Sequence, residues 1–211
     1  MNLLDLINSE TGKTLIQGTS KQIGESPDKT ASALSAALPL ILGGMKNNAK
    51  STDGASSLLN ALSGNKHDGS IINNLGSILG GGGIDNDVLQ DGAGILNHVF
   101  KGKEQNVAGA VSKSSGIDMG SAMKILQVAA PFVMSYLGKE TTQQNISDQN
   151  GVNNLLGGLL GSNSSQEQSM VERLLDSDGD GSIIDDVAGM IMGSGKKSGG
   201  GLGSLLGGLF K

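Results

Sequence analysis

The chain has 211 residues and a net charge of -5, with 35 glycines, two histidines and no cysteine. The absence of cysteine excludes disulfides, thiol catalysis and cysteine-ligated zinc, and two histidines are too few for a conventional zinc site. The acidic balance disfavours phosphate backbones, and one tyrosine with three phenylalanines offers no stacking surface for single strands. We therefore expect no nucleic-acid partner and a core built from aliphatic side chains and methionine.

The N-terminal sequence and the lengths of the apolar runs predict where the protein resides. Asp5 stands where a secretory signal peptide would carry basic residues. No apolar run reaches the roughly 18 residues that a membrane span requires. We therefore expect a soluble, cytoplasmic protein.

Apolar residues recur at helical spacing along most of the chain, and no stretch of strict apolar/polar alternation predicts a strand. These patterns predict an all-α, multi-helical fold. In chain order, the shorter predicted helices are Leu3–Ser9, Gly12–Ile23, Ala55–Leu62, Ile71–Leu79, Asp87–Phe100, Asn106–Lys113, Asp148–Leu160, Gln166–Leu175 and Ile183–Met192.

Two longer amphipathic patterns contain Pro39 and Pro131. The first begins where Ser26 can cap a helix and Pro27 suits its first position, and Asp118 is placed to cap the second. A proline inside a helix removes one N–H donor and its ring clashes with the preceding turn. Each pattern is therefore compatible with one kinked helix or with a pair of helices.

The chain also matches itself when it is shifted by 92 positions, which predicts an internal duplication. The paired residues include Gly24 with Gly116 and Pro39 with Pro131, and the offset grows with distance along the chain, as insertions would require. The predicted organisation is copy one at 1–79, a Gly-rich linker at 80–86, copy two with an acidic loop at 87–192, and a flexible Gly-rich tail at 193–211.

The acidic loop of copy two has the spacing of a calcium site. Asp176, Asp178 and Asp180 occupy positions 1, 3 and 5 of an EF-hand-type loop, followed by a glycine at position 6. A hard divalent cation prefers six to eight oxygen ligands, and alternate residues of a tight turn can point inward together. Ser182, at position 7, would add its backbone carbonyl. The predicted metal ligands are Asp176, Asp178, Asp180, Ser182 and Asp186.

The second half of this loop departs from the EF-hand pattern. Position 9 is Ile184, and position 12, where a bidentate glutamate normally sits, is Val187. The exit ligand must then come from Asp185 or Asp186, so we expect a weak or non-standard calcium site. Magnesium could also occupy the site, although it tolerates distorted geometry less well. The alternative is a solvated turn whose acids favour the N-terminus of the next helix.

The corresponding loop of copy one lacks these ligands. It has Gly64, Lys66 and Asp68 where copy two has three aspartates. Lys66 would place a cation inside the cage, so we predict no metal there.

No catalytic constellation is evident in the sequence. His98 lies in an apolar helical pattern, where a lone histidine is typical of a core or boundary residue, and His67 has no identifiable nucleophile beside it. We therefore predict that the protein is not an enzyme. A hydrolase or transferase that uses His98 or clustered acids is the alternative.

The segment Gly94–Phe100, together with Ser115–Ile117 and Ala129–Val133, resembles the bacterial YidB-like family, domain of unknown function 937. Ala36–Pro39 and the segment from Gly54 to Leu62 fit the same resemblance, which covers roughly residues 3–192. The resemblance implies a helical bacterial protein and brings no reaction, substrate or catalytic residue with it.

Taken together, these patterns predict a non-enzymatic helical binding or structural module with one EF-hand-like calcium loop. Its partner would be an unidentified protein or a second copy of itself. The alternative is an oligomerising or membrane-adhering scaffold without metal, because Lys196, Lys197 and Lys211 surround an apolar stretch at 202–210. For that tail, disorder is preferred over membrane contact.

Overall fold

The computed structural model describes residues 3–64, 72 and 85–161. These residues form helices and no strand, which confirms the predicted all-α, multi-helical fold. The predicted helices at Gln166–Leu175 and Ile183–Met192, the predicted tail, and all but one residue of the predicted helix Ile71–Leu79 lie outside the described residues.

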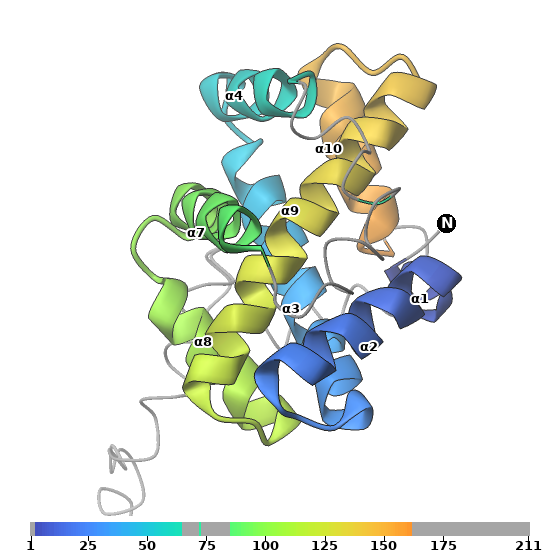
Figure 1. Ribbon diagram of the computed structural model, residues 1–211. Coiled ribbons are helices and arrows are strands. Elements are labelled where there is room, and N and C mark those ends of the chain that lie inside the picture. The colour runs from blue at the N-terminus through green and yellow to red at the C-terminus, as the bar shows by residue number, and fades with distance from the viewer. Residues whose placement is uncertain (1–2, 65–71, 73–84, 162–211) are drawn as a thin grey trace, which may run out of the picture.

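The helices follow the sequence patterns closely (Figure 1). They are α1 (Leu3–Asn8), α2 (Glu10–Ile23), α3 (Pro27–Asn48), α4 (Thr52–Leu62), α7 (Asn86–Phe100), α8 (Glu104–Ser115), α9 (Met119–Gln143) and α10 (Gln149–Leu159).

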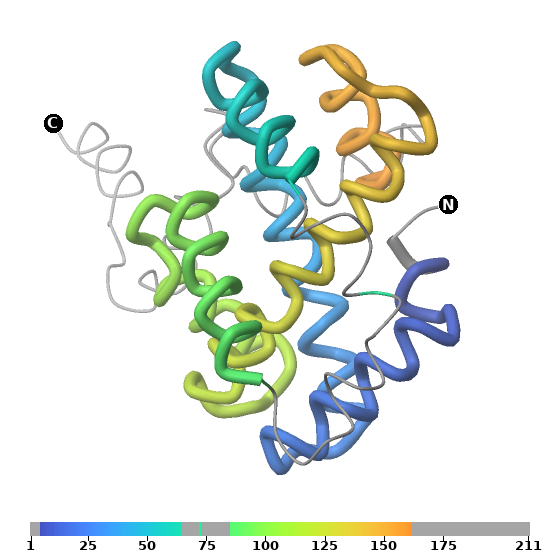
Figure 2. The backbone as a smooth tube through the Cα atoms, turned by 45° about the horizontal axis from the view of Figure 1, so that its top comes forward, coloured from blue at the N-terminus to red at the C-terminus, as the bar shows by residue number. Residues whose placement is uncertain are grey.

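The two long helices α3 and α9 pack against each other through the middle of the molecule (Figures 1 and 2). Helices α7 and α8 lie on one side of this pair, α1 and α2 lie on the other, and α4 and α10 pack at one end. Pro39 lies inside α3 and Pro131 inside α9. Each proline-containing pattern therefore forms one helix, not a pair.

The buried apolar side chains form one cluster that spans both predicted copies. Leu34 and Ile41 of α3 are 1% and 0% exposed, and Ile125 and Leu126 of α9 are both 0% exposed. Because α3 belongs to copy one and α9 to copy two, the two predicted copies share a core. The predicted domain boundaries stay predictions.

Equivalent positions of the two predicted copies have the same local geometry. Gly24 ends α2 with φ 73° and donates its N–H to the Ser20 carbonyl at 3.0 Å. Gly116 ends α8 with φ 68° and donates to the Ser112 carbonyl at 2.9 Å. Glycine suits both positions because other residues rarely adopt a positive φ. The duplication itself remains a prediction.

Both predicted N-caps are confirmed. The Ser26 hydroxyl accepts the N–H of Lys29 at 3.3 Å at the start of α3. The Asp118 carboxylate accepts the N–H groups of Gly120 and Ser121 at 2.8 and 3.0 Å at the start of α9. Hydrogen bonds from Ser121 hold the pKa of Asp118 below its usual range. Side-chain caps thus fix the first turns of both central helices.

Candidate functional site, a groove between α4 and α7

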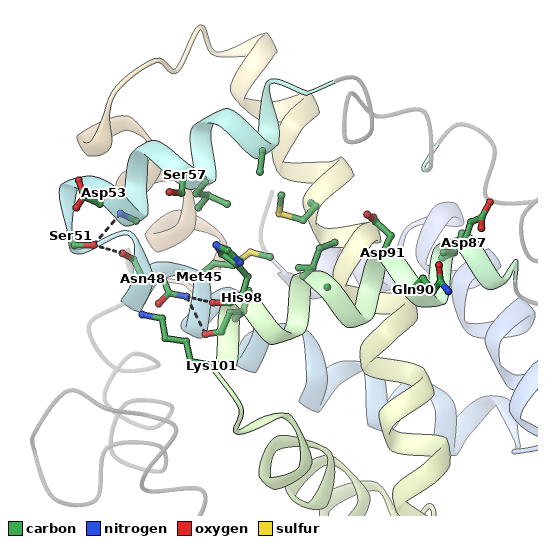
Figure 3. A pocket seen from close by; sticks show the side chains of 18 residues that line it. Met45, Asn48, Ser51, Asp53, Ser57, Asp87, Gln90, Asp91, His98 and Lys101 are labelled. Atoms are coloured by element: carbon green, nitrogen blue, oxygen red, sulfur yellow. Dashed lines mark hydrogen bonds between the residues drawn. The ribbon is translucent and has the colours of Figure 1, made fainter.

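A groove of about 1140 Å³ runs between α4 and α7 (Figure 3). Each wall is one face of a helix, because the lining residues recur three or four positions apart. The lining residues of α4 include Gly54, Ser57, Leu58 and Ala61, and those of α7 include Asp87, Asp91, Ile95 and His98. The C-terminal end of α3 and the middle of α9 close the groove from below through Met45, Asn48 and Met134.

The α4 wall is held close to the end of α3 by a glycine. A Cβ added at Gly54 would collide with the backbone oxygen of Asn48, so no larger residue fits without a shift of the backbone. The Ser51 hydroxyl also accepts the N–H of Gly54 at 3.1 Å and caps α4. These contacts fix the direction in which α4 leaves α3.

The α7 wall is tied to the same point. The Asn48 side-chain amide donates to the backbone carbonyls of His98 and Val99 at 3.3 and 3.1 Å. These carbonyls belong to the last turn of α7, where backbone acceptors lack partners within the helix. Asn48, which lies at the base of the α4 wall, therefore donates hydrogen bonds to backbone carbonyls at the end of the α7 wall.

Helix α10 supports the connection between α3 and α4 from outside. The Gln149 amide donates to the carbonyls of Ala49 and Lys50 at 3.1 and 3.0 Å. The Asn153 amide also donates to the Ala49 carbonyl, at 3.2 Å. Because both walls and their connection are hydrogen-bonded, the groove is preformed.

The interior of the groove is apolar and adaptable. Met45 and Met134 are 2% and 3% exposed and form its floor. Leu58 and Ile95 are half-buried on the facing walls. Methionine is unbranched and polarisable, so a floor of two methionines adjusts to apolar surfaces of different shape.

The rim of the groove is acidic. Asp53 and Asp87 are exposed and lie at opposite ends of the groove, and Asp91 adds a third carboxylate beside Asp87 (Figure 3). Lys101 is the single lysine or arginine among the lining residues. The lining therefore carries an excess of negative charge around an apolar floor. Within the described ranges, no group of three or more His, Asp or Glu side chains is arranged to hold a metal ion.

His98 is exposed in this groove, so of the core or boundary position that its apolar helical pattern predicted, the core position is wrong. Among the described residues, no hydrogen bond joins its imidazole to the hydroxyl of Ser51 or Ser57 (Figure 3). The described lining of the groove therefore shows no nucleophile hydrogen-bonded to a base, the arrangement expected of nucleophilic catalysis.

The residues predicted to bind calcium lie outside the described residues. They are Asp176, Asp178, Asp180, Ser182 and Asp186, with Asp185 as the alternative exit ligand. His67, Lys66 and Asp68 of the copy-one loop also lie outside. The calcium loop therefore stays a prediction from ligand spacing.

Apart from His98, the sequence analysis did not predict a functional role for the individual residues that line the groove. Asp87 and Asp91 lie one helical turn apart, and Ile95 follows one turn later, which places all three on one face of a predicted helix. This spacing was the available signal. It shows that the residues share a face, but it cannot show that no other helix covers that face.

Comparison with known proteins places the chain in a family. The sequence model of a family described as a bacterial protein of unknown function, domain of unknown function 937, matches residues 5–140. The chain belongs to this family. The match confirms the resemblance, includes both walls and the floor of the groove, and ends before the acidic loop. No curated protein and no solved structure matches the chain.

None of the helices in the described part of this family member is both long enough and apolar enough to cross a lipid bilayer.

Proposed function

We propose that this protein is a non-enzymatic helical binding module whose α4–α7 groove takes an apolar peptide segment flanked by basic residues. The observation that carries the proposal is the preformed groove with a methionine floor and an acidic rim. An amphipathic helix that lies in an apolar groove is a recurring mode of peptide recognition. Apolar contacts would supply affinity, and the carboxylates would orient the partner and accelerate its association.

The dimensions of the groove suit a short helix. The lining residues of the α7 wall extend from Asp87 to Lys101, which corresponds to about 21 Å at 1.5 Å per residue. A partner helix of about fourteen residues has the same length. Its basic residues would meet Asp87 at one end of the groove and Asp53 at the other (Figure 3).

The charge of the rim gives the first test. A synthetic leucine–lysine peptide of about fourteen residues, with leucines on one helical face, is expected to bind the full chain. The double variant Asp53→Lys/Asp87→Lys should raise the dissociation constant of the peptide about tenfold at low salt. Each substitution removes one attraction and adds one repulsion, each worth a few tenths of a kcal/mol or more, and the four contributions together approach the roughly 1.4 kcal/mol of a tenfold change. Fluorescence anisotropy of the labelled peptide measures this change.

Asp28→Lys is the matched control for that test. Asp28, like Asp53 and Asp87, is an exposed aspartate in the first turn of a helix, so its reversal has the same consequence for the helix dipole. It lies at the start of α3, whereas the groove is at the end of α3. Equal loss of binding in Asp28→Lys, or no binding by the wild type, would refute the groove as the site.

A second proposal rests on the acidic loop. We propose that Asp176, Asp178, Asp180, the Ser182 carbonyl and an exit carboxylate from Asp186 or Asp185 bind one calcium ion. The support is the ligand spacing of the sequence. Without a glutamate at position 12, the ion would stabilise a local turn and not act as a high-affinity signal.

Calorimetric titration with calcium tests this loop. The wild type should bind one ion, and Asp178→Ala should lose most of the binding heat because it removes a carboxylate from the centre of the ligand set. Asp68→Ala, in the corresponding loop of copy one, is the matched control and should bind calcium as the wild type does. If the wild type and Asp178→Ala give the same null isotherm, the calcium proposal is wrong.

A further inference from the structure

The chain itself contains a segment with the chemistry that the groove favours. Three apolar segments, at 166–175, 183–192 and 202–210, lie outside the described residues, and a fourth, at 71–79, lies outside them except for Ile72. The segment at 71–79 has no basic residue, and those at 166–175 and 183–192 contain acids. The segment at 202–210 differs from these three because every charged residue near it is a lysine. Lys196, Lys197 and Lys211 flank it, and no acidic residue follows Asp186.

The spacing of the apolar residues in this segment is helical. Leu202, Leu205, Leu206 and Leu209 follow the pattern i, i+3, i+4 and i+7, so a helix would place all four on one face. We propose that residues 202–210 bind as a helix in the α4–α7 groove of the same chain, with this leucine face on the methionine floor. The inference rests on the proposed binding function of the groove.

Charge complementarity favours this occupant over the other three segments. The groove carries Asp53 at one end and Asp87 with Asp91 at the other, against the single lysine at position 101. The proposed occupant has Lys196 and Lys197 before its apolar face and Lys211 after it. Lysines on both sides of an apolar helix can therefore meet carboxylates at both ends of the groove.

The length of the intervening chain permits an intramolecular complex. The described chain ends after α10, at Gly161, and about 40 residues separate this point from Leu202. An extended chain of that length spans up to about 130 Å, whereas α9, the longest described helix, measures about 38 Å. Tethering makes the binding intramolecular, with an effective concentration set by the length of the intervening chain, so a weak intrinsic affinity is sufficient.

The glycines of the segment make such a complex reversible. Gly203, Gly207 and Gly208 lie between the leucines, and each glycine inside a helix costs about 1 kcal/mol relative to alanine. A helix of this composition is unstable without the groove and is held only by its leucine contacts. The segment would thus act as a displaceable occupant that competes with external peptides.

Competition for the groove provides the test, with the full chain throughout. Leu205→Ser/Leu209→Ser replaces two of the four leucines of the apolar face with polar residues. This variant should bind the leucine–lysine peptide about tenfold more tightly than the wild type, because the groove is no longer self-occupied. Gly203→Ser/Gly207→Ser changes the same number of residues on the remaining faces of the segment. This matched control should retain the self-occupied state and bind the peptide at least as weakly as the wild type.

The outcomes separate the two proposals. If the wild type and Leu205→Ser/Leu209→Ser bind the peptide equally and Asp53→Lys/Asp87→Lys still weakens it, the groove binds peptides but the internal occupant is refuted. If neither the wild type nor Leu205→Ser/Leu209→Ser binds the peptide, the proposed binding function of the groove is refuted together with the internal occupant.

A spin label provides a direct measurement of position. Because the chain has no cysteine, Ser204→Cys creates a single attachment point within the segment. The label should broaden the amide NMR signals of groove residues such as Ser57 and Gly94 and spare those of α2. Broadening that grows with protein concentration, together with a dimer mass in light scattering, would show that the segment binds a second copy and would overturn the intramolecular proposal.

Discussion

Phe100→Ala is expected to lower the free energy of unfolding by about 3–5 kcal/mol, the range for truncation of a buried phenylalanine. Phe100 is 2% exposed and is among the largest fully buried side chains of the described core. Its ring lies beside Gly44 of α3, since a Cβ added at Gly44 would meet the Phe100 Cε1 atom at 3.1 Å. Removal of the ring leaves a cavity, because the packed side chains around a buried residue relax only partly into the space.

Urea denaturation monitored by circular dichroism measures the loss. Met119→Ala is the matched control, because Met119 is a large apolar residue that is 46% exposed at the start of α9. Its truncation should change stability by no more than about 0.5 kcal/mol. A loss of similar size in both variants would contradict the burial of Phe100 between the end of α7 and α3.

The helices could be predicted because their signals are local. Ser26 and Asp118 stand three or fewer residues before the N–H groups they accept, and Gly24 and Gly116 follow the last turns that they end. The two proline-containing patterns could not be assigned from local signals, because each was compatible with one kinked helix or with two helices. Packing decides between these alternatives: Pro131 is buried within α9, where neighbouring helices hold the chain in place.

The groove could not be predicted, because it depends on which helical faces remain uncovered. Leu58 and Ile95 lie in helical patterns of the same kind as Leu34 and Leu126, yet the first two line a groove and the other two are fully buried. The difference arises because α4 and α7 both pack against α9, and the faces that carry Leu58 and Ile95 line the space between these two helices. The exposure of His98 could not be predicted for the same reason. Its neighbours Val99 and Phe100 are buried, whereas its own side chain is exposed.

Glycine content was the least informative part of the sequence. Runs of glycine indicated linkers and tails, but a glycine inside a helix gives no sign of whether it faces solvent or a neighbouring helix. Gly92 and Gly94 both lie in α7. Gly92 is buried against α9, whereas Gly94 is exposed and has no atom within 4 Å of the position that a Cβ would take.

Gly92→Ala should therefore destabilise the protein, and Gly94→Ala should not. A Cβ at Gly92 would overlap the backbone oxygen of Gln127 in α9, and a backbone atom inside a helix cannot move aside as a flexible side chain can. Overpacking of this kind costs about 1–3 kcal/mol or more. Gly94→Ala should instead raise the free energy of unfolding by about 0.5–1 kcal/mol, because alanine loses less backbone entropy in a helix.

Chemical denaturation of both variants, together with binding of the leucine–lysine peptide, connects this packing to the groove. Because α7 forms one wall, a shift of α7 away from α9 should also alter the groove, so Gly92→Ala is expected to weaken peptide binding at temperatures where it remains folded. If both variants were stabilised alike, α7 and α9 would not approach as closely as Gly92 indicates. If Gly92→Ala lost stability but kept full peptide affinity, the α7 wall would be less rigidly coupled to the core than the hydrogen bonds from Asn48 imply.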